Sequence, residues 1–317
     1  MAPGRTIANT ANTPARDPLQ ALLARPDGAV LAVIAAVEGP SYRPVGAMMA
    51  VFGENDRAGT LSSGCIEADI ALHAMRARKQ GAPVLLRYGR GSPFVDIDLP
   101  CGGGLDILLL PRPDLAALAA VAANRARRRP CTLGIDLEQG AMTVGDAGDT
   151  ARDGARLSVR FAPDIRFLVF GTGPEASTFA ALVQAAGYPN LLLSPDAGTL
   201  ADGAAAGCKT QHLTAQAFPG NLVVDDRTAI VLFFHDHDRE PPVLQSALAT
   251  PAFYIGAQGS IRARDARLMT LAAMGMQRHD RDRLHGPIGM IRSARDAGTL
   301  AVSVLAEVLD VARRRGG

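Results

Sequence analysis

Several features that are common in proteins are scarce in this chain of 317 residues, which has no Trp and only 4% aromatic residues. Its core must therefore be built from Ala, Val, Leu and Ile, and the 48% hydrophobic content is typical of a folded globular protein. No window approaches about eighteen consecutive apolar residues, so no membrane-spanning segment is expected. The net charge of +2 is too small to indicate binding to nucleic acid or to an anionic membrane.

The chain also lacks the marks of a secreted, disulfide-bonded protein. Residues 1–16 contain no apolar h-region of a signal peptide and are expected to be disordered. Its four cysteines, Cys65, Cys101, Cys131 and Cys208, are widely spaced and form no C-x-x-C pair. These absences favour a cytoplasmic protein whose cysteines are structural or reactive rather than disulfide-bonded.

The hydrophobic pattern predicts two domains. The first, residues 17–145, begins with a short helix capped by Asp17, continues with apolar strands and two longer helices, and is expected to be an α+β domain. The stretch 138–164 is rich in Gly, Asp, Thr and Arg and is interpreted as the junction. In the second domain, residues 164–317, strands alternate with helices, which predicts a Rossmann-like, mostly parallel sheet with helices on both faces.

The second domain opens with a glycine-rich turn that is typical of nucleotide-binding proteins. An apolar strand runs into "GTGPEA", and a helix and the strand "NLLLS" follow. In such a turn Gly171 permits the tight bend, Gly173 lets a pyrophosphate approach, and Ala176 lets the helix pack closely on the strand. Ser194 occupies the place of the usual ribose-binding acid, and Asp196, two residues later, is its possible substitute. The pattern predicts a Rossmann unit but leaves open whether the turn binds a nucleotide or merely needs glycine.

A polar segment, "HDHDRE", follows another strong strand of the second domain. His235, Asp236, His237 and Asp238 would stand at the carboxyl end of that strand, where open α/β sheets bind ligands. Two histidines and two carboxylates can ligate a metal, but adjacent residues alternate in direction and no remote third ligand is evident. Because Asp238 is also a suitable N-cap for the next helix, we favour capping and loop ordering over a metal site.

Two cysteines lie in loops whose chemistry suits a ligand. Cys65 ends "TLSSGC" at the start of an expected helix, where the helix dipole lowers the pKa of a thiol and favours the thiolate. Cys101 precedes three glycines, which expose backbone amides and admit close approach by a ligand. The alternative is that both are ordinary solvent-facing loop cysteines. Cys131 and Cys208 adjoin strands and are expected to be structural.

Several separated motifs carry a family resemblance that extends over residues 28–307. In chain order they are "EGPSYRPVGAMM", "GTLSSGCIEADI", "DLPCGGGLDILLLP", "FGTGPEA", "FFHDHD", "FYIGAQGS" and "LHGPIG". The series resembles the XdhC/CoxI family of accessory proteins for molybdenum hydroxylases such as xanthine dehydrogenase. The resemblance implies an N-terminal domain with glycine–cysteine loops and a Rossmann-like C-terminal domain. It also implies binding of molybdenum cofactor (molybdopterin), sulfuration of that cofactor by a cysteine desulfurase, and delivery to the apo-hydroxylase.

The resemblance also implies which residues bind the cofactor. Cys65 and Cys101 match the family's two loop cysteines and are candidate contacts to molybdenum, a soft metal centre that suits thiolates. The other candidates in the first domain are Arg43, Ser62, Ser63, Gly64, Gly102 and Gly103. This sequence departs from the family pattern at Ser63, where Gly is common, and at "SPD", where Asp-Pro-Arg is frequent after the second Rossmann strand. The second departure argues against a shared dinucleotide mode.

Three functional classes follow from these observations. The first is a non-catalytic, homodimeric chaperone that binds molybdenum cofactor, with a nucleotide as an additional ligand of Gly171, Gly173, Ala176 and Asp196. The second is an NAD(P)-dependent oxidoreductase, against which stand the missing ribose acid and the lack of an identifiable proton donor. The third is a docking protein for a molybdenum hydroxylase that binds no cofactor.

Overall fold

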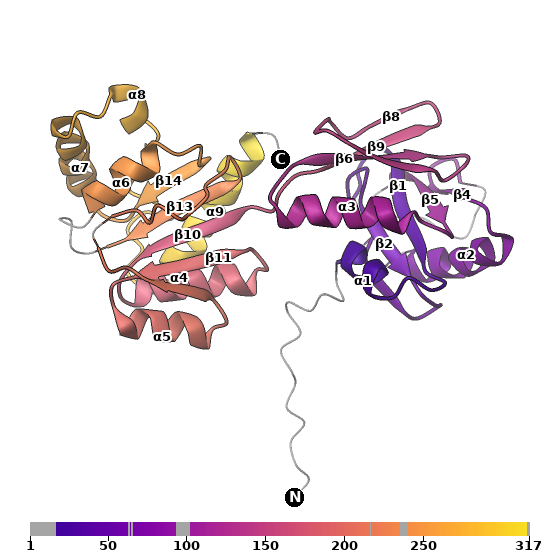
Figure 1. The fold of residues 1–317 in the computed structure, drawn as a ribbon, viewed down its shortest axis with the longest axis horizontal. Helices are drawn as coiled ribbons and strands as arrows, with labels where there is room; N and C mark the ends of the chain where they lie inside the picture. The colour runs from indigo at the N-terminus through magenta and orange to yellow at the C-terminus, as the bar shows by residue number, and fades with distance from the viewer. Residues whose placement is uncertain are drawn as a thin grey trace, which may run out of the picture. The chain divides into compact units, whose positions relative to one another are not determined.

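The computed structural model describes residues 17–62, 64, 66–92, 102–215, 217–234 and 240–315. The chain forms two compact units, which Figure 1 shows in indigo to magenta and in pink through orange to yellow. The first unit ends at Pro163 and the second begins at Asp164.

The first unit is built on a five-stranded antiparallel sheet. Its strands, in spatial order, are β3 (Arg57–Gly59), β2 (Met48–Val51), β1 (Val30–Glu38), β5 (Gly104–Leu110) and β4 (Val84–Gly89). Side chains of a strand alternate between the two faces of a sheet. In β1, Leu31 and Val33 join one hydrophobic cluster and Val30 and Ala32 join another, so both faces of this sheet are covered.

One face of this sheet is covered by α2 (Glu67–Gln80), whose Ile70 and Ala74 are fully buried against it. The other face shares its cluster with two helices and a second antiparallel sheet. These elements are α1 (Pro18–Ala24), α3 (Leu115–Ala126), β7 (Met142–Gly145), β6 (Cys131–Asp136), β9 (Arg156–Phe161) and β8 (Ala151–Asp153). The predicted start of α1 is confirmed, because the Asp17 carboxylate accepts a hydrogen bond from the N–H of Leu19 over 2.9 Å.

The stretch 138–164, which composition indicated as the junction, contributes three strands to this second sheet. Strands β7, β8 and β9 lie within it, and Leu157 and Val159 of β9 are buried in the core. Its glycines serve tight turns between short strands, as the positive φ values of 72° at Gly140 and 56° at Gly154 indicate. The first unit therefore continues beyond residue 145.

The second unit is built on a six-stranded parallel sheet. Its strands, in spatial order, are β12 (Lys209–His212), β11 (Asn190–Ser194), β10 (Arg166–Gly171), β13 (Thr228–Phe233), β14 (Tyr254–Ala257) and β15 (Leu284–His285). The chain builds first to one side of β10 and then to the other. The change of direction falls between β10 and β13, which is where open α/β sheets bind ligands.

Helices cover both faces of the parallel sheet (Figure 1). On one face lie α4 (Pro174–Ala185), α5 (Ala197–Ala205) and α9 (Ala297–Arg314), and on the other α6 (Glu240–Leu248) and α7 (Ile261–Ala273). The short α8 (Arg278–Arg281) follows α7. The predicted fold, a Rossmann-like parallel sheet with helices on both faces beside an α+β unit, is confirmed. None of the helices in the described ranges is long and apolar enough to cross a membrane.

Candidate functional site

Three segments that carry predicted cofactor residues leave the same end of the five-stranded sheet. Glu38, the last residue of β1, pairs with Gly104, the first of β5, and Gly104 pairs with Gly89 at the end of β4. Gly59 at the end of β3 pairs with Met49 near the start of β2, which runs antiparallel to β1. We call this the loop end of the sheet. The segments that leave the sheet here are 39–47, 60–66 and 90–103.

Glu67, the first residue of α2, has a buried carboxylate at the loop end, since the residue is only 4% exposed. Six donors from the segment 60–66 point at its two oxygens. Oε1 accepts from Thr60 Oγ1 over 2.5 Å, Leu61 N–H over 3.0 Å and Ser62 N–H over 2.8 Å. Oε2 accepts from Ser62 Oγ over 2.6 Å, Gly64 N–H over 2.8 Å and Ile66 N–H over 3.3 Å.

These hydrogen bonds keep Glu67 ionised inside the protein. Burial raises the pKa of its carboxyl group, but the hydrogen bonds from Ser62 and Thr60 outweigh burial and lower the pKa from 4.5 to about 2. A carboxylate has about four lone-pair positions, so six donors use its whole capacity. The backbone amides of Leu61, Ser62, Gly64 and Ile66 are thus directed at the protein's own carboxylate.

Ser62 and Gly64, both predicted to contact a cofactor, differ in their surroundings. Ser62 is 3% exposed, and its hydroxyl donates to Glu67 and accepts from the Ile66 N–H over 3.1 Å, so it supports the loop from inside. Gly64 has a φ of 111° and no atom within 4 Å of the place where a Cβ would stand, so its backbone is open. The predicted residues on either side of Gly64, Ser63 and Cys65, lie outside the described residues.

The glycines after Cys101 bring two loops into backbone contact. A Cβ on Gly103 would lie 2.2 Å from the carbonyl oxygen of Pro40 and 3.0 Å from that of Glu38, so only glycine permits this approach. Gly102 has a φ of 68°, and among the described residues no atom lies within 4 Å of its Cβ position, so on that side its backbone is open to a ligand. Cys101 itself lies outside the described residues.

Arg43 is the predicted cation of the loop end. It is exposed, and its backbone carbonyl accepts a hydrogen bond from Ser41 Oγ over 2.8 Å, which shapes the turn. Across the described ranges its guanidinium makes no hydrogen bond or ion pair. The neighbouring Tyr42 is 62% exposed. Arg43 therefore offers an accessible positive charge in the segment 39–47, whose Pro40 lies against Gly103.

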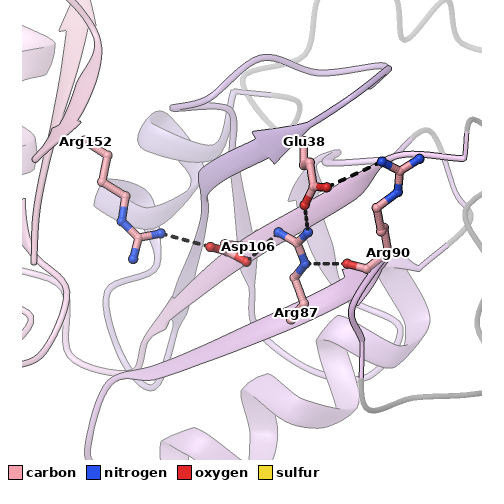
Figure 2. A network of polar contacts seen from close by, with 5 residues as sticks. All are labelled: Glu38, Arg87, Arg90, Asp106 and Arg152. Carbon is pink, nitrogen blue, oxygen red and sulfur yellow. Dashed lines mark hydrogen bonds and ion pairs between the residues drawn. The ribbon is translucent and has the colours of Figure 1, made fainter. Parts of the chain in front are cut away.

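A network of ion pairs lies beneath the same loops. Figure 2 shows Arg87 between Glu38 and Asp106, with Arg90 beyond Glu38 and Arg152 beyond Asp106. Arg87 pairs with Glu38, and its Nη1 lies 3.1 Å from Asp106 Oδ1. Arg152 reaches Asp106 Oδ2 over 2.9 Å, whereas Arg90 is held only at 3.6 Å from Glu38. Within this network, three guanidinium groups therefore pair with two carboxylates.

In the second unit, the predicted glycine turn has the expected backbone. Gly171 ends β10 where a Cβ would lie 2.5 Å from the carbonyl oxygen of Phe233, so the neighbouring strand excludes any side chain. Gly173 has a φ of 81°, and Ala176 is fully buried under α4. Packing and backbone conformation thus account for all three small residues without a bound nucleotide.

The polar groups around this turn are bonded to one another. The Gly173 N–H donates to Thr199 Oγ1 over 2.8 Å, and the Thr199 hydroxyl donates to Asp196 Oδ2 over 2.6 Å. Asp196 also caps α5 by accepting from the Thr199 N–H over 2.7 Å, and these hydrogen bonds lower the pKa of Asp196. Asp196, predicted as a substitute ribose acid, therefore serves as a helix cap. Pro174, at the start of α4, has no N–H to offer a phosphate.

The remaining predicted sites divide between the described and undescribed parts of the chain. Cys131 and Cys208 are buried, and burial raises the pKa of both thiols, as expected for structural cysteines. The segment 235–238, weighed as a metal site or a cap, lies outside the described residues. Where the structure describes the chain, no group of three His, Cys, Asp or Glu residues is placed to hold a metal ion.

Comparisons with known proteins match each of the two units to a family model. Residues 22–89 match the family described as "XdhC and CoxI family", and residues 167–308 match the "XdhC Rossmann domain". A relative from Escherichia coli, "Molybdenum cofactor insertion chaperone PaoD", is 35% identical over 289 residues, which cover 90% of this chain and 83% of the relative. The chain belongs to the XdhC and CoxI family. The resemblance inferred from the motifs is thereby confirmed.

Two further relatives extend the family comparison. A protein from Bacillus subtilis, described as a probable subunit of xanthine dehydrogenase, is 24% identical over 341 residues, covering 93% of this chain and 97% of the relative. A crystal structure from Bacillus halodurans, described as a xanthine dehydrogenase, is 20% identical with a TM-score of 0.76. It covers 94% of this chain and 96% of its own, and at that identity it supports the shared fold alone.

Proposed function

We propose that this family member is a molybdenum cofactor chaperone that holds the cofactor at the loop end of the first unit. The observation that carries the proposal is that the segments containing Arg43, Cys65 and Cys101 all leave the sheet at this end. The E. coli relative is named an insertion chaperone for this cofactor, which supports the same role here. No catalytic step is assigned to the chain in this proposal.

The chemistry of the cofactor suits the groups at the loop end. Molybdenum cofactor is a pterin dithiolene that carries a soft metal centre and a phosphate. Thiolates of Cys65 and Cys101 would contact the metal centre, and the exposed guanidinium of Arg43 would pair with the phosphate. The open backbones of Gly64 and Gly102 would let the ligand approach closely.

The proposal also includes the partners that the family resemblance implies. A cysteine desulfurase would sulfurate the cofactor while it is bound, and a molybdenum hydroxylase of the xanthine dehydrogenase type would then receive it. We expect the chaperone to act as a homodimer. Pull-down of the purified chain against a hydroxylase and a desulfurase, each with and without cofactor, tests these steps one at a time.

The central experiment compares Cys65→Ala and Cys101→Ala with Cys208→Ala. Each protein is purified, and its bound molybdopterin and melting temperature are measured. The first two variants should lose most of the cofactor. Their folding stability should fall by less than the ~2 kcal/mol typical of emptying a core site. Cys208→Ala, which alters a buried thiol of the other unit, should retain it.

The same measurements separate the competing functions. If Cys65→Ala and Cys101→Ala melt early but retain cofactor, both cysteines are structural and the proposed site is wrong. Turnover that depends on a nicotinamide would favour an NAD(P)-dependent oxidoreductase. Neither copurified molybdopterin nor such turnover would favour a docking protein that binds no cofactor.

A further inference from the structure

We propose that Glu67 is a positioning residue whose buried carboxylate fixes the backbone on both sides of Cys65. The hydrogen bonds between Glu67 and the described residues of the segment 60–66 support the anchoring. Its consequence for cofactor binding rests on the proposed function. In the sequence alone, Glu67 is only a polar neighbour of the cysteine.

The hydrogen bonds of Glu67 enclose the position of Cys65. The N–H groups of Gly64 and Ile66, the residues directly before and after it, both donate to Oε2, over 2.8 and 3.3 Å. Ser62 adds its hydroxyl to the same oxygen, and a second hydrogen bond joins that hydroxyl to the Ile66 N–H. One carboxylate oxygen therefore holds the chain on both sides of the cysteine.

This arrangement differs from an ordinary helix cap. In a capping box, a Glu in the third helical position reaches back to the N–H of the N-cap residue. Glu67 is instead the first residue of α2, and the N-cap residue, Ile66, has no side-chain capping bond. Its carboxylate reaches back as far as Thr60 and gathers hydroxyl and amide donors from the whole segment. The Glu67 carboxylate therefore orders the segment before α2 and does not act as a cap of the helix.

The anchoring has a consequence for the cofactor's phosphate. Successive backbone amides form a concave site that attracts anions. In the segment 60–66 that site is already filled by Glu67, so the described amides there are not available to an external phosphate. We therefore expect the phosphate to be recognised outside the segment 60–66, with the exposed Arg43 as the candidate cation.

Glu67→Gln tests the anchoring directly, because it keeps the side-chain size but replaces one acceptor oxygen by an NH₂ donor. Hydrogen–deuterium exchange followed by mass spectrometry reads the loop without any cofactor. The amides of residues 61–66 should exchange roughly tenfold faster or more, since hydrogen bonds to a charged acceptor are strong. Exchange in the core strands of the same unit should change much less. Glu67→Asp, which keeps the charge on a shorter chain, should recover part of the protection.

Leu22→Ala is the matched control for a loss of stability alone. Leu22 is fully buried in the cluster on the opposite face of the sheet from α2. This variant should lower the melting temperature as well, but leave the loop exchange and the bound molybdopterin near wild-type levels at temperatures where it is folded. Glu67→Gln, measured under the same conditions, should lose cofactor as Cys65→Ala does.

The outcomes separate the two proposals. Loop exchange that stays at the wild-type rate in folded Glu67→Gln would overturn the anchoring role. Faster loop exchange with full retention of molybdopterin would overturn the positioning role while leaving the proposed function intact. If the wild-type chain binds no molybdopterin, the proposed function fails, and the exchange data still decide whether Glu67 anchors the loop. Thr60→Val, which removes a single donor, gives a milder variant should Glu67→Gln fail to fold.

Discussion

The hydroxyl oxygen of Thr199, on α5, accepts a hydrogen bond from the backbone N–H of Gly173 over 2.8 Å. This bond ties the glycine turn after β10 to the helix that follows β11. In dinucleotide-binding Rossmann units, amides of this turn approach the pyrophosphate. Here that amide has an internal partner, so a nucleotide would have to displace Thr199 to use it. The Rossmann unit of this chain therefore has the fold of a nucleotide site, but the Gly173 N–H in its turn already has a partner.

The first prediction is that nucleotides bind the second unit weakly and without discrimination. Gly173 is already bonded, Pro174 has no N–H, and Asp196 is engaged as a helix cap. Calorimetric titration with NAD, NADP, ATP and GTP should give dissociation constants of about 1 mM or weaker. Tight binding of NAD alone would contradict this prediction and favour the alternative function, an NAD(P)-dependent oxidoreductase.

The second prediction concerns the stability of the turn. Thr199→Val keeps the shape of this buried side chain but removes the acceptor for Gly173 and the donor to Asp196. It should destabilise the protein by about 1 kcal/mol, because the half-buried N–H of Gly173 loses its partner. Urea unfolding measures the loss. Thr270→Val, at an exposed position on α7, is the control and should change stability little.

The elements that could be predicted from the sequence are those with a local signal in their own residues. Asp17 and Pro18 predict the start of α1, and "GTGPEA" between two apolar runs predicts the Rossmann unit, because these signals are local. Strand β12 is not predicted because its four residues, Lys209–His212, carry no apolar pattern and are mostly exposed. Asp196 is a candidate ribose acid by position, although an Asp three residues before a Thr is also a capping pattern. The structure shows the capping role, and ribose binding by Asp196 stays a prediction.

The role of Glu67 could not be predicted from the sequence for a different reason. Its spacing from Thr60 and Ser62 matches no standard capping motif. Six donors meet one carboxylate only because the segment 60–66 curls back over the start of α2. That curl depends on the positive φ of Gly64 and on the burial of Leu61 and Ile66 in the core. These features belong to the tertiary structure and cannot be read from local sequence patterns.

The third prediction is that the ionised carboxylate of Glu67 makes the free energy of unfolding depend on pH in the acid range. Its pKa in the folded protein, about 2, is below its ordinary value of 4.5. The stability from its ionised form is therefore fully present above about pH 4.5 and is lost as the pH falls towards 2. A shift of this size corresponds to about 3 kcal/mol. The unfolding free energy of Glu67→Gln, measured against wild type by urea titration, should differ most at neutral pH and converge in acid. A difference that is constant with pH would contradict it.

The fourth prediction tests the contact between two loops at the loop end. Gly103→Ala places a Cβ 2.2 Å from the carbonyl oxygen of Pro40, and backbone must move to admit it. The cost should be about 1–3 kcal/mol, as for other overpacked sites, with a matching loss of bound molybdopterin. Gly145→Ala is the control, because no atom lies within 4 Å of its Cβ position and its φ is not positive. Equal melting temperatures for the two variants would show that the contact is not required.

The fifth prediction assigns the phosphate of the cofactor to Arg43. Arg43→Ala should leave the melting temperature unchanged, because the guanidinium is exposed and has no partner in the described part of the chain. Bound molybdopterin should fall by roughly tenfold or more, the loss expected for a charge-assisted hydrogen bond to phosphate. Arg57→Ala is a matched control, since Arg57 is also exposed but stands at the start of β3, away from the loop end. Arg43→Lys should recover part of the binding, because it keeps the charge but loses the bidentate geometry. Full retention of molybdopterin by Arg43→Ala would move phosphate recognition elsewhere, with the partly held Arg90 as the next cation to test.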